Sequence, residues 1–174
     1  ASARTSAKRK NHRKMRKSLP VFIFFLLLMS CDKNRVFDQY QSLPGEWHRD
    51  SIVSFKVNAP DTIRNYNLFI NLRNNSDYKY SNLFLVTSMN FPNGKVITDT
   101  LEYEMTKPSG EWLGTGFGEL KENKLWYKEN VRFSEAGEYE FSLQQAMRKN
   151  GETEGIESLD GVTEVGFRIE YTEN

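Results

Sequence analysis

The sequence predicts an all-β protein: an antiparallel β-sandwich of the jelly-roll or immunoglobulin-like kind, preceded by a signal peptide and a short tether. Three observations predict this fold. Apolar and polar residues alternate over several short segments, turn-forming residues separate those segments, and no segment keeps a helical period. The 129 residues from Glu46 to Asn174 are enough for one such domain.

The first thirty residues precede the predicted fold. Residues 1–14 lack an initiator Met, and we expect them to be a mis-called upstream extension. Residues 15–30 are expected to be a lipoprotein signal peptide, because a basic start is followed by nine apolar residues, Val21 to Met29, and by the small Ser30. An apolar run of nine is too short for a spanning helix, which needs roughly 20 residues.

Cys31 is the only cysteine of the chain. The tetrapeptide Leu28-Met29-Ser30-Cys31 resembles the bacterial lipobox, in which the Cys sulfur is lipidated and the preceding peptide is removed. We therefore predict that acylated Cys31 attaches the protein to membrane lipid. Several acyl chains on one residue anchor a protein durably, whereas one chain alone binds only marginally.

Removal of the signal peptide changes the net charge. Eight of the 24 Lys and Arg residues and none of the 23 acidic residues precede Cys31, so the mature chain carries 16 cations against 23 anions, a net charge of −7. A charge of that sign excludes nucleic acid as the expected partner. With its one Cys lipidated, the mature chain forms no disulfide within itself and is held together by packing.

The mature chain is expected to contain a tether and one domain. Residues 31–45 are polar and end in the breaker pair Pro44-Gly45, so they are predicted to be a lipid-anchored tether. Residues 46–174 are predicted to form a single β-sandwich domain. Its expected strands, in chain order, are 52–57, 66–73, 83–89, 95–105, 125–133, 138–145 and 164–171, with a short helical turn at 144–149.

The segment from Glu135 to Phe141 has the spacing of a tyrosine corner. In this feature a Tyr hydroxyl bonds a backbone group a few residues upstream, at the entry to a strand. We assign Tyr139 this structural role.

Residues typical of catalysis are sparse, and we expect no enzyme activity, metal or cofactor. The mature chain has one histidine, His48, beside Trp47 in an expected first strand, so a histidine metal cluster is excluded and a Ser-His-Asp triad would rest on this single unsupported residue. The glycines from Gly114 to Gly118 resemble a phosphate-binding loop only superficially, and close backbone packing explains them better. The carboxylates alternate with apolar residues as solvated strand faces do, and the acidic stretch 152–160 lacks the spacing of a calcium loop.

Aromatic residues give the alternative function, a carbohydrate- or peptidoglycan-binding module. Sugar rings stack on exposed aromatic side chains, although aromatics are equally favoured in strands and cores. The candidates for such a platform are Trp47, Tyr78, Tyr80, Trp112, Trp126 and Tyr127.

An ordered set of short segments resembles the gliding-motility lipoprotein GldH family of Bacteroidota. The set comprises the lipobox and Leu72-Arg73-Asn74, Tyr78-Lys-Tyr80-Ser-Asn82-Leu83, Asp99-Thr100-Leu101, Glu111-Trp112-Leu113-Gly114-Thr-Gly116, Gly137-Glu-Tyr139-Glu-Phe141, Gln145-Ala-Met147-Arg148 and Val165-Gly166-Phe167-Arg-Ile169-Glu170. The resemblance covers essentially all of the mature chain. It implies a non-catalytic lipoprotein of the cell envelope that interacts with other proteins of the gliding-motility and associated secretion machinery. No acidic run follows Cys31 as in surface-exported lipoproteins, so we expect the outer membrane and its periplasmic face.

The same resemblance implies two kinds of candidate site. Asp50-Ser51-Ile52, Asp61-Thr62-Ile63 and Asp99-Thr100-Leu101 match the O-glycosylation motif of this phylum, with Thr62 the best candidate because it lies in a turn-like region. The candidate interaction patch consists of Tyr78, Tyr80, Asn82, Gln145 and Arg148; pairing of its arginine with carboxylates is the structural alternative.

Overall fold

A computed structural model describes residues 32–172, and those from Asn34 onward form one compact unit. The unit contains ten strands and, among the described residues, no helix. The strands are β1 (Arg35–Ser42), β2 (Glu46–His48), β3 (Val53–Asn58), β4 (Tyr66–Asn74), β5 (Asn82–Asn90), β6 (Val96–Glu104), β7 (Lys121–Val131), β8 (Glu138–Gln145), β9 (Ser158–Asp160) and β10 (Val162–Tyr171).

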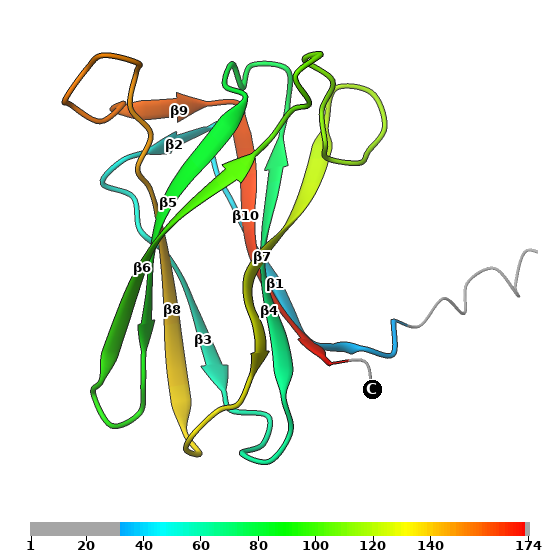
Figure 1. Cartoon of the computed structure of the whole chain (residues 1–174), viewed down its shortest axis with the longest axis vertical. Coiled ribbons are helices and arrows are strands. Elements are labelled where there is room, and N and C mark those ends of the chain that lie inside the picture. The colour runs from blue at the N-terminus through cyan, green and yellow to red at the C-terminus, as the bar shows by residue number, and fades with distance from the viewer. Residues whose placement is uncertain (1–31, 173–174) are drawn as a thin grey trace, which may run out of the picture. The chain divides into compact units, whose positions relative to one another are not determined.

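Two four-stranded antiparallel sheets face each other (Figure 1). The first sheet has the order β1-β10-β4-β7 and the second has the order β3-β8-β5-β6, while β2 and β9 form a small ribbon at one end. The predicted antiparallel β-sandwich is confirmed. Alternation explains why these segments become strands, because Tyr66, Leu68, Ile70 and Leu72 of β4 all point inward and are buried.

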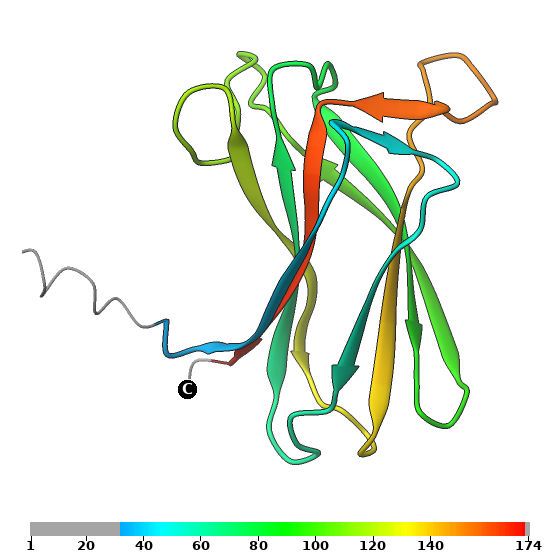
Figure 2. The ribbon, with the colours of Figure 1, turned by 180° about the vertical axis from the view of Figure 1, so that it is seen from behind.

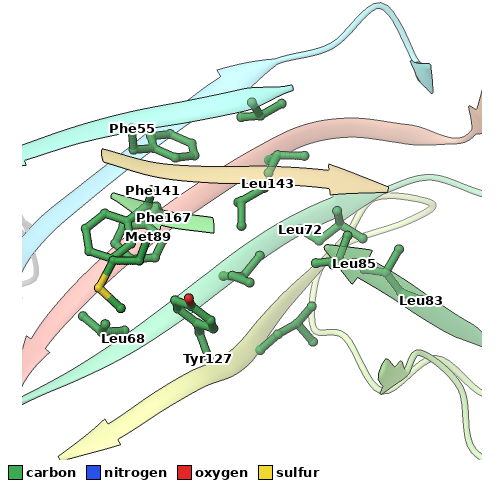
Figure 3. Close-up of a cluster of buried hydrophobic side chains, with 14 of the residues drawn as sticks. Phe55, Leu68, Leu72, Leu83, Leu85, Met89, Tyr127, Phe141, Leu143 and Phe167 are labelled. Atoms are coloured by element: carbon green, nitrogen blue, oxygen red, sulfur yellow. The ribbon is translucent and has the colours of Figure 1, made fainter. Parts of the chain in front are cut away.

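An aromatic stack joins the two sheets at the centre of the core (Figure 3). The ring of Phe167 in β10 stacks on Phe141 in β8 at 4.2 Å between centroids and on Phe55 in β3 at 6.0 Å. All three side chains are at most 2 % exposed. Burial of a large aromatic side chain contributes roughly 1.5–3 kcal/mol, so this stack holds the sheets face to face.

The strand registers give the sandwich two distinct ends. β1 begins, β10 ends and β4 begins at one end, which we call the proximal end, because Arg35 pairs with Glu170 and Tyr66 with Tyr171. β4 ends, β7 begins and β6 ends at the other, which we call the distal end. Figure 2 shows β1 and β10 side by side along this axis. The nine residues of β4 separate the ends by about 30 Å.

Three details differ from the sequence-based expectations. Residues 35–42, predicted as tether, form the edge strand β1, and the predicted domain boundary at residue 46 is therefore too late. Phe37 explains the pairing, since its ring packs against Phe167 at 6.3 Å. The predicted helical turn at 144–149 is wrong because Gln144 and Gln145 still pair with β5. The three-residue strand β9 is missing from the predicted set.

Candidate functional site

Two of the five predicted patch residues are structural. Tyr78 is 2 % exposed, its hydroxyl donates to the carbonyl of Asn82 at 2.7 Å, and its ring contacts those of Tyr80 and Trp112. Burial raises the pKa of Tyr78 above its ordinary value, so its hydroxyl remains a donor.

Gln145 is 3 % exposed and ties down the connection after β8. Its amide donates to the carbonyl of Ile156 at 2.9 Å, and its side-chain oxygen accepts from the backbone N–H of Met147 at 2.9 Å. Tyr78 and Gln145 therefore lie in the interior, and only Tyr80, Asn82 and Arg148 of the predicted patch reach solvent. The structure brings both halves of the patch to the distal end, where Leu85 pairs with Gln145.

A more exposed apolar surface lies at the same end of the sandwich, on the connection between β6 and β7. Phe117 is 100 % exposed, and Leu113 and Leu120 are each 46 % exposed. We call these three residues the distal surface. Sequence reasoning missed it, because a solvated Phe in a glycine-rich run cannot be distinguished from a core Phe by its residue type.

The glycines around Phe117 shape this connection. A Cβ atom on Gly116 would overlap the carbonyl oxygen of Leu120, and Thr115 and Glu122 exchange backbone hydrogen bonds of 2.9 and 2.7 Å. The loop therefore folds back on itself, which leaves Phe117 at its tip. The prediction of close backbone packing instead of a phosphate-binding loop is confirmed at Gly116.

A hollow of about 1280 Å³ lies at the proximal end on the outer face of the first sheet. β4, β7, β10 and the connection between β3 and β4 contribute its walls. The residues that give it its chemistry are Ile63, Arg64, Lys124, Trp126, Arg132 and Tyr171.

Trp126 is the exposed aromatic of this hollow. Its ring packs on buried Phe69 at 4.4 Å between centroids and leaves 53 % of the residue exposed. Lys124 extends over the same Phe69 ring at 4.0 Å and pairs with Glu170 at 2.7 Å. Arg64 lies over the ring of Tyr171 at 5.2 Å. Two cation–aromatic contacts therefore line the hollow.

The aromatics proposed as a sugar platform do not come together. Trp47 is fully buried and donates its indole N–H to the carbonyl of Ser51 at 2.8 Å, while Tyr127 points into the core. Trp112 packs at the distal end against Tyr78, and Trp126 lies on the outer face of the first sheet. The six-residue platform is therefore wrong, and Trp126 is its one member in the hollow.

Carboxylates on the outer face are occupied by arginine. The Arg73 guanidinium donates to Glu122 at 3.0 Å and also to Glu164, so it lies between the two carboxylates. Its carbon stands 4.4 Å from the ring centroid of Tyr40, whose hydroxyl donates to Glu122 at 2.9 Å. Burial, together with the Glu122 carboxylate, raises the pKa of Tyr40. Both carboxylates therefore contact Arg73, whereas the two carboxylates of a glycosidase flank a sugar.

His48 lies between two acidic residues at the surface. Asp50 and Glu157 lie 3.7 Å from the two ring nitrogens of half-buried His48, at the surface. Among residues 32–172, no three His, Cys, Asp or Glu side chains are grouped as metal ligands would be. Within the same range there is no helix of the length and apolarity needed to span a membrane.

The three predicted glycosylation residues, Ser51, Thr62 and Thr100, are all exposed. Asp61, which precedes Thr62, accepts backbone hydrogen bonds from Ile63 at 2.8 Å and Arg64 at 2.7 Å and thereby builds a tight turn. The bond from Arg64 contributes most to lowering the pKa of Asp61. Cys31, the signal peptide and the upstream extension lie outside the described residues.

Comparison with known proteins finds one matching family model and two similar proteins with names. The family model described as GldH lipoprotein matches residues 35–169. A protein of Christiangramia forsetii named gliding motility lipoprotein GldH homolog is 61 % identical over 163 residues, which cover 92 % of this chain and 100 % of that protein. The gliding motility lipoprotein GldH of Flavobacterium johnsoniae is 49 % identical over 145 residues, covering 83 % and 90 %.

Among solved structures, the VP2 subviral particle of infectious bursal disease virus matches 80 % of this chain with a TM-score of 0.41 and 14 % identity. The chain spans about a third of that viral protein, 33 % of its length.

Proposed function

The chain belongs to the GldH lipoprotein family, and from this premise we propose that it is a non-catalytic interaction component of the gliding-motility and associated secretion machinery. As a lipoprotein of this family, it is lipid-anchored in the cell envelope. The finer assignments, acylation at Cys31 and the periplasmic face of the outer membrane, are part of the proposal. A Cys31→Ala variant that incorporates no labelled palmitate and leaves the membrane fraction supports the first of them.

The main support for an interaction role is that the side chain of Phe117 is fully exposed. Phe is enriched at protein interfaces, and exposed apolar groups on a solvated domain cost free energy unless a partner covers them. Leu113 and Leu120 flank it, and the folded-back glycine loop limits the conformational entropy that would be lost on binding.

The position of this surface suits a partner away from the lipid anchor. β4 separates the proximal end, where the mature chain enters the sandwich, from the distal end by about 30 Å. Tyr80, Asn82 and Arg148, the solvent-accessible part of the predicted patch, belong to the same end and supply polar groups for the rim of the interface.

Gliding cells that carry a photo-crosslinking amino acid at position 117 test the proposal. We expect a crosslink to an envelope protein of the machinery and loss of spreading in a Phe117→Ala variant. Loss of a central aromatic anchor weakens binding by about 2 kcal/mol, roughly thirty-fold.

Val96 provides the matched control because it is a 56 % exposed apolar residue at the proximal end, on the other sheet. Val96→Ala is expected to spread normally. Normal spreading of Phe117→Ala, with the protein at normal abundance, contradicts the proposed docking surface.

Glycan binding is a second candidate, favoured by the half-exposed Trp126 in a hollow with asparagine walls. A glycan array tests it with Trp126→Ala and, as control, Trp112→Ala. Binding that depends on Trp126 alone supports this role; no binding, or binding indifferent to both changes, counts against it.

A further inference from the structure

We propose that the proximal hollow is a membrane-contact surface: the domain lies against phospholipid headgroups through Trp126, Ile63 and the neighbouring arginines. The inference rests on the proposed acylation of Cys31 and adds a second, non-covalent contact with the same bilayer.

Only three residues lie between Cys31 and the first strand. β1 begins at Arg35, and Asn34, directly before it, lines the hollow. Three peptide units separate Cys31 from Asn34, and an extended chain advances at most about 3.6 Å per residue, so their Cα atoms lie within about 11 Å of each other. The headgroup layer on each side of the hydrocarbon core is itself about 5–7 Å thick. An acyl anchor on Cys31 therefore keeps the hollow at the bilayer surface.

Because β1 pairs with β10 from Arg35 onward, only the residues before Arg35 can act as a tether. Residues 35–42 would have to leave the sheet to lift the domain away, which would expose Phe37 and break the register from Arg35 to Ser42. The backbone N–H of Tyr171 also donates to the carbonyl of Asn34 at 2.9 Å, which fixes the point where the chain enters the sandwich.

The exposed apolar residues match the membrane interface. Ile63 is 77 % exposed and Trp126 is 53 % exposed, and both belong to the hollow. Tryptophan is enriched at the headgroup level because its ring is apolar and its indole N–H is polar. Burial of an aliphatic side chain such as Ile63 in the acyl boundary adds affinity in the way that amphipathic helices do.

The charges at this surface complement lipid phosphate. The hollow includes three cations, Arg64, Lys124 and Arg132, against two anions, Glu129 and Glu170, in a mature chain whose net charge is −7. Two of these cations are already paired, Lys124 with Glu170 at 2.7 Å and Arg64 with Asp61 at 3.3 Å. Arg132 is exposed and makes no ion pair with another described residue, so its guanidinium is available for a phosphate oxygen.

A glycan or a partner protein would need the hollow to face away from the bilayer. The short connection to the anchor opposes that orientation, which is why the observations favour lipid.

The purified full-length lipoprotein, reconstituted in vesicles of phosphatidylethanolamine and phosphatidylglycerol, tests the inference. A bromine-labelled phosphatidylcholine, brominated near the headgroup, quenches tryptophans that touch the interface. Trp47 is buried, Trp112 is at the distal end and Trp126 is in the hollow, so single Trp→Phe variants separate their contributions. We expect quenching in the parent protein and in Trp112→Phe, and loss of most of it in Trp126→Phe.

Flotation of the vesicles reports anchoring separately. A protein that floats but is not quenched overturns the membrane contact and leaves the lipid anchor intact. A protein that fails to float refutes the anchor on which the inference rests. Quenching that persists in Trp126→Phe and disappears in Trp112→Phe overturns the inference by placing the distal end at the bilayer.

Charge reversal supplies the second variant. Arg64→Glu combined with Arg132→Glu is expected to reduce quenching without loss of flotation, whereas the distal pair Arg148→Glu and Lys149→Glu is expected to quench as the parent does. If the Arg64→Glu and Arg132→Glu double variant is quenched as strongly as the parent protein, the proposed contact between these arginines and lipid phosphate is wrong. A shift of Trp126 fluorescence caused by peptidoglycan fragments in detergent, with no quenching in vesicles, overturns the assignment in favour of a glycan site.

Discussion

The Tyr139 hydroxyl donates a hydrogen bond to the carbonyl of Glu135 at 3.2 Å and accepts one from the backbone N–H of the same residue at 3.3 Å. One side chain thus satisfies both backbone groups of a residue in the β7–β8 connection. Its ring packs edge-on against Phe133 at 4.9 Å, so the turn into β8 is fixed to the core.

Replacement of Tyr139 by Phe tests this corner. The ring remains, but both hydrogen bonds are lost, and each contributes about 1 kcal/mol net. We expect the free energy of unfolding in urea to fall by about 1–2 kcal/mol. Tyr80→Phe is the control, because the Tyr80 hydroxyl bonds no other described residue; an equal loss in both variants contradicts a specific role for the corner.

Gly161 and Gly151 have nearly the same φ angle but differ in how close other atoms come, so substitutions at the two positions distinguish backbone strain from steric overlap. Gly161 has φ +83° and Gly151 has φ +82°, but a Cβ on Gly161 would overlap the backbone N of Tyr78, while nothing lies within 4 Å of one on Gly151. Gly151→Ala is expected to cost only the left-handed strain, roughly 1 kcal/mol. Gly161→Ala adds overpacking of roughly 1–3 kcal/mol or more. Equal melting temperatures would show that the Tyr78 loop moves aside freely.

Buried tyrosines make the fold sensitive to alkali. Burial is the main cause that raises the pKa of Tyr127 to about 12, and the Asp99 carboxylate, which accepts from its hydroxyl at 3.2 Å, adds to it. In the unfolded chain the phenol ionises near pH 10. The stability associated with a neutral Tyr127 is therefore complete below pH 10 and is lost as pH rises from 10 to 12, by about 1.4 kcal/mol per pH unit.

Tyr127→Phe is expected to flatten the dependence of unfolding free energy on pH in this window by about one proton. Trp126→Phe, which changes the neighbouring residue without a titrating group, should keep the parent slope. Identical slopes for Tyr127→Phe and the parent would refute ionisation of Tyr127 as a cause of alkaline unfolding.

Arg73 tests the outer-face network. A lysine cannot contact Glu122 and Glu164 in two directions and lie flat on Tyr40 at the same time. Because Arg73 is 32 % exposed, we expect Arg73→Lys to lose only about 1 kcal/mol, and less at high salt. Arg64→Lys, at a 63 % exposed position, should change stability little. A salt-independent loss at Arg73 would point to packing instead of charge.

O-glycosylation is predicted most strongly at Thr62, which is exposed beside the Asp61 turn. The intact mass of native protein is expected to exceed that of the lipidated chain, and Thr62→Ala should remove the excess. Ser51→Ala and Thr100→Ala are the comparisons. A mass that contains lipid alone excludes the modification at all three positions.

Alternation was sufficient to predict the central strands, because Leu68 and Ile70 must point one way and their neighbours the other. The same reasoning missed β1, since an edge strand with polar Asp38, Gln39 and Gln41 does not differ from a tether until Phe37 finds its partner in β10. That contact spans most of the chain, and local pattern cannot show it.

The candidate sites were less predictable than the fold for a related reason. Tyr78 and Gln145 are polar enough for a surface patch, yet both are buried, Tyr78 against Trp112 and Gln145 against the connection that contains Ile156. Conversely, the sequence gives no sign that Phe117 is solvated or that Trp126 and Ile63 share one hollow. Exposure depends on which loops meet at an end of the sandwich, and this is set by tertiary packing.

The edge position of β1 has a mechanical consequence. A pull between the start of β1 and the distal surface runs parallel to the strands and across the β1–β10 hydrogen bonds, so those bonds resist in shear, all together, instead of opening one after another. Detachment of the first strand is thus a single cooperative rupture, and the sandwich is suited to transmit tension along its long axis without unravelling from its tethered end.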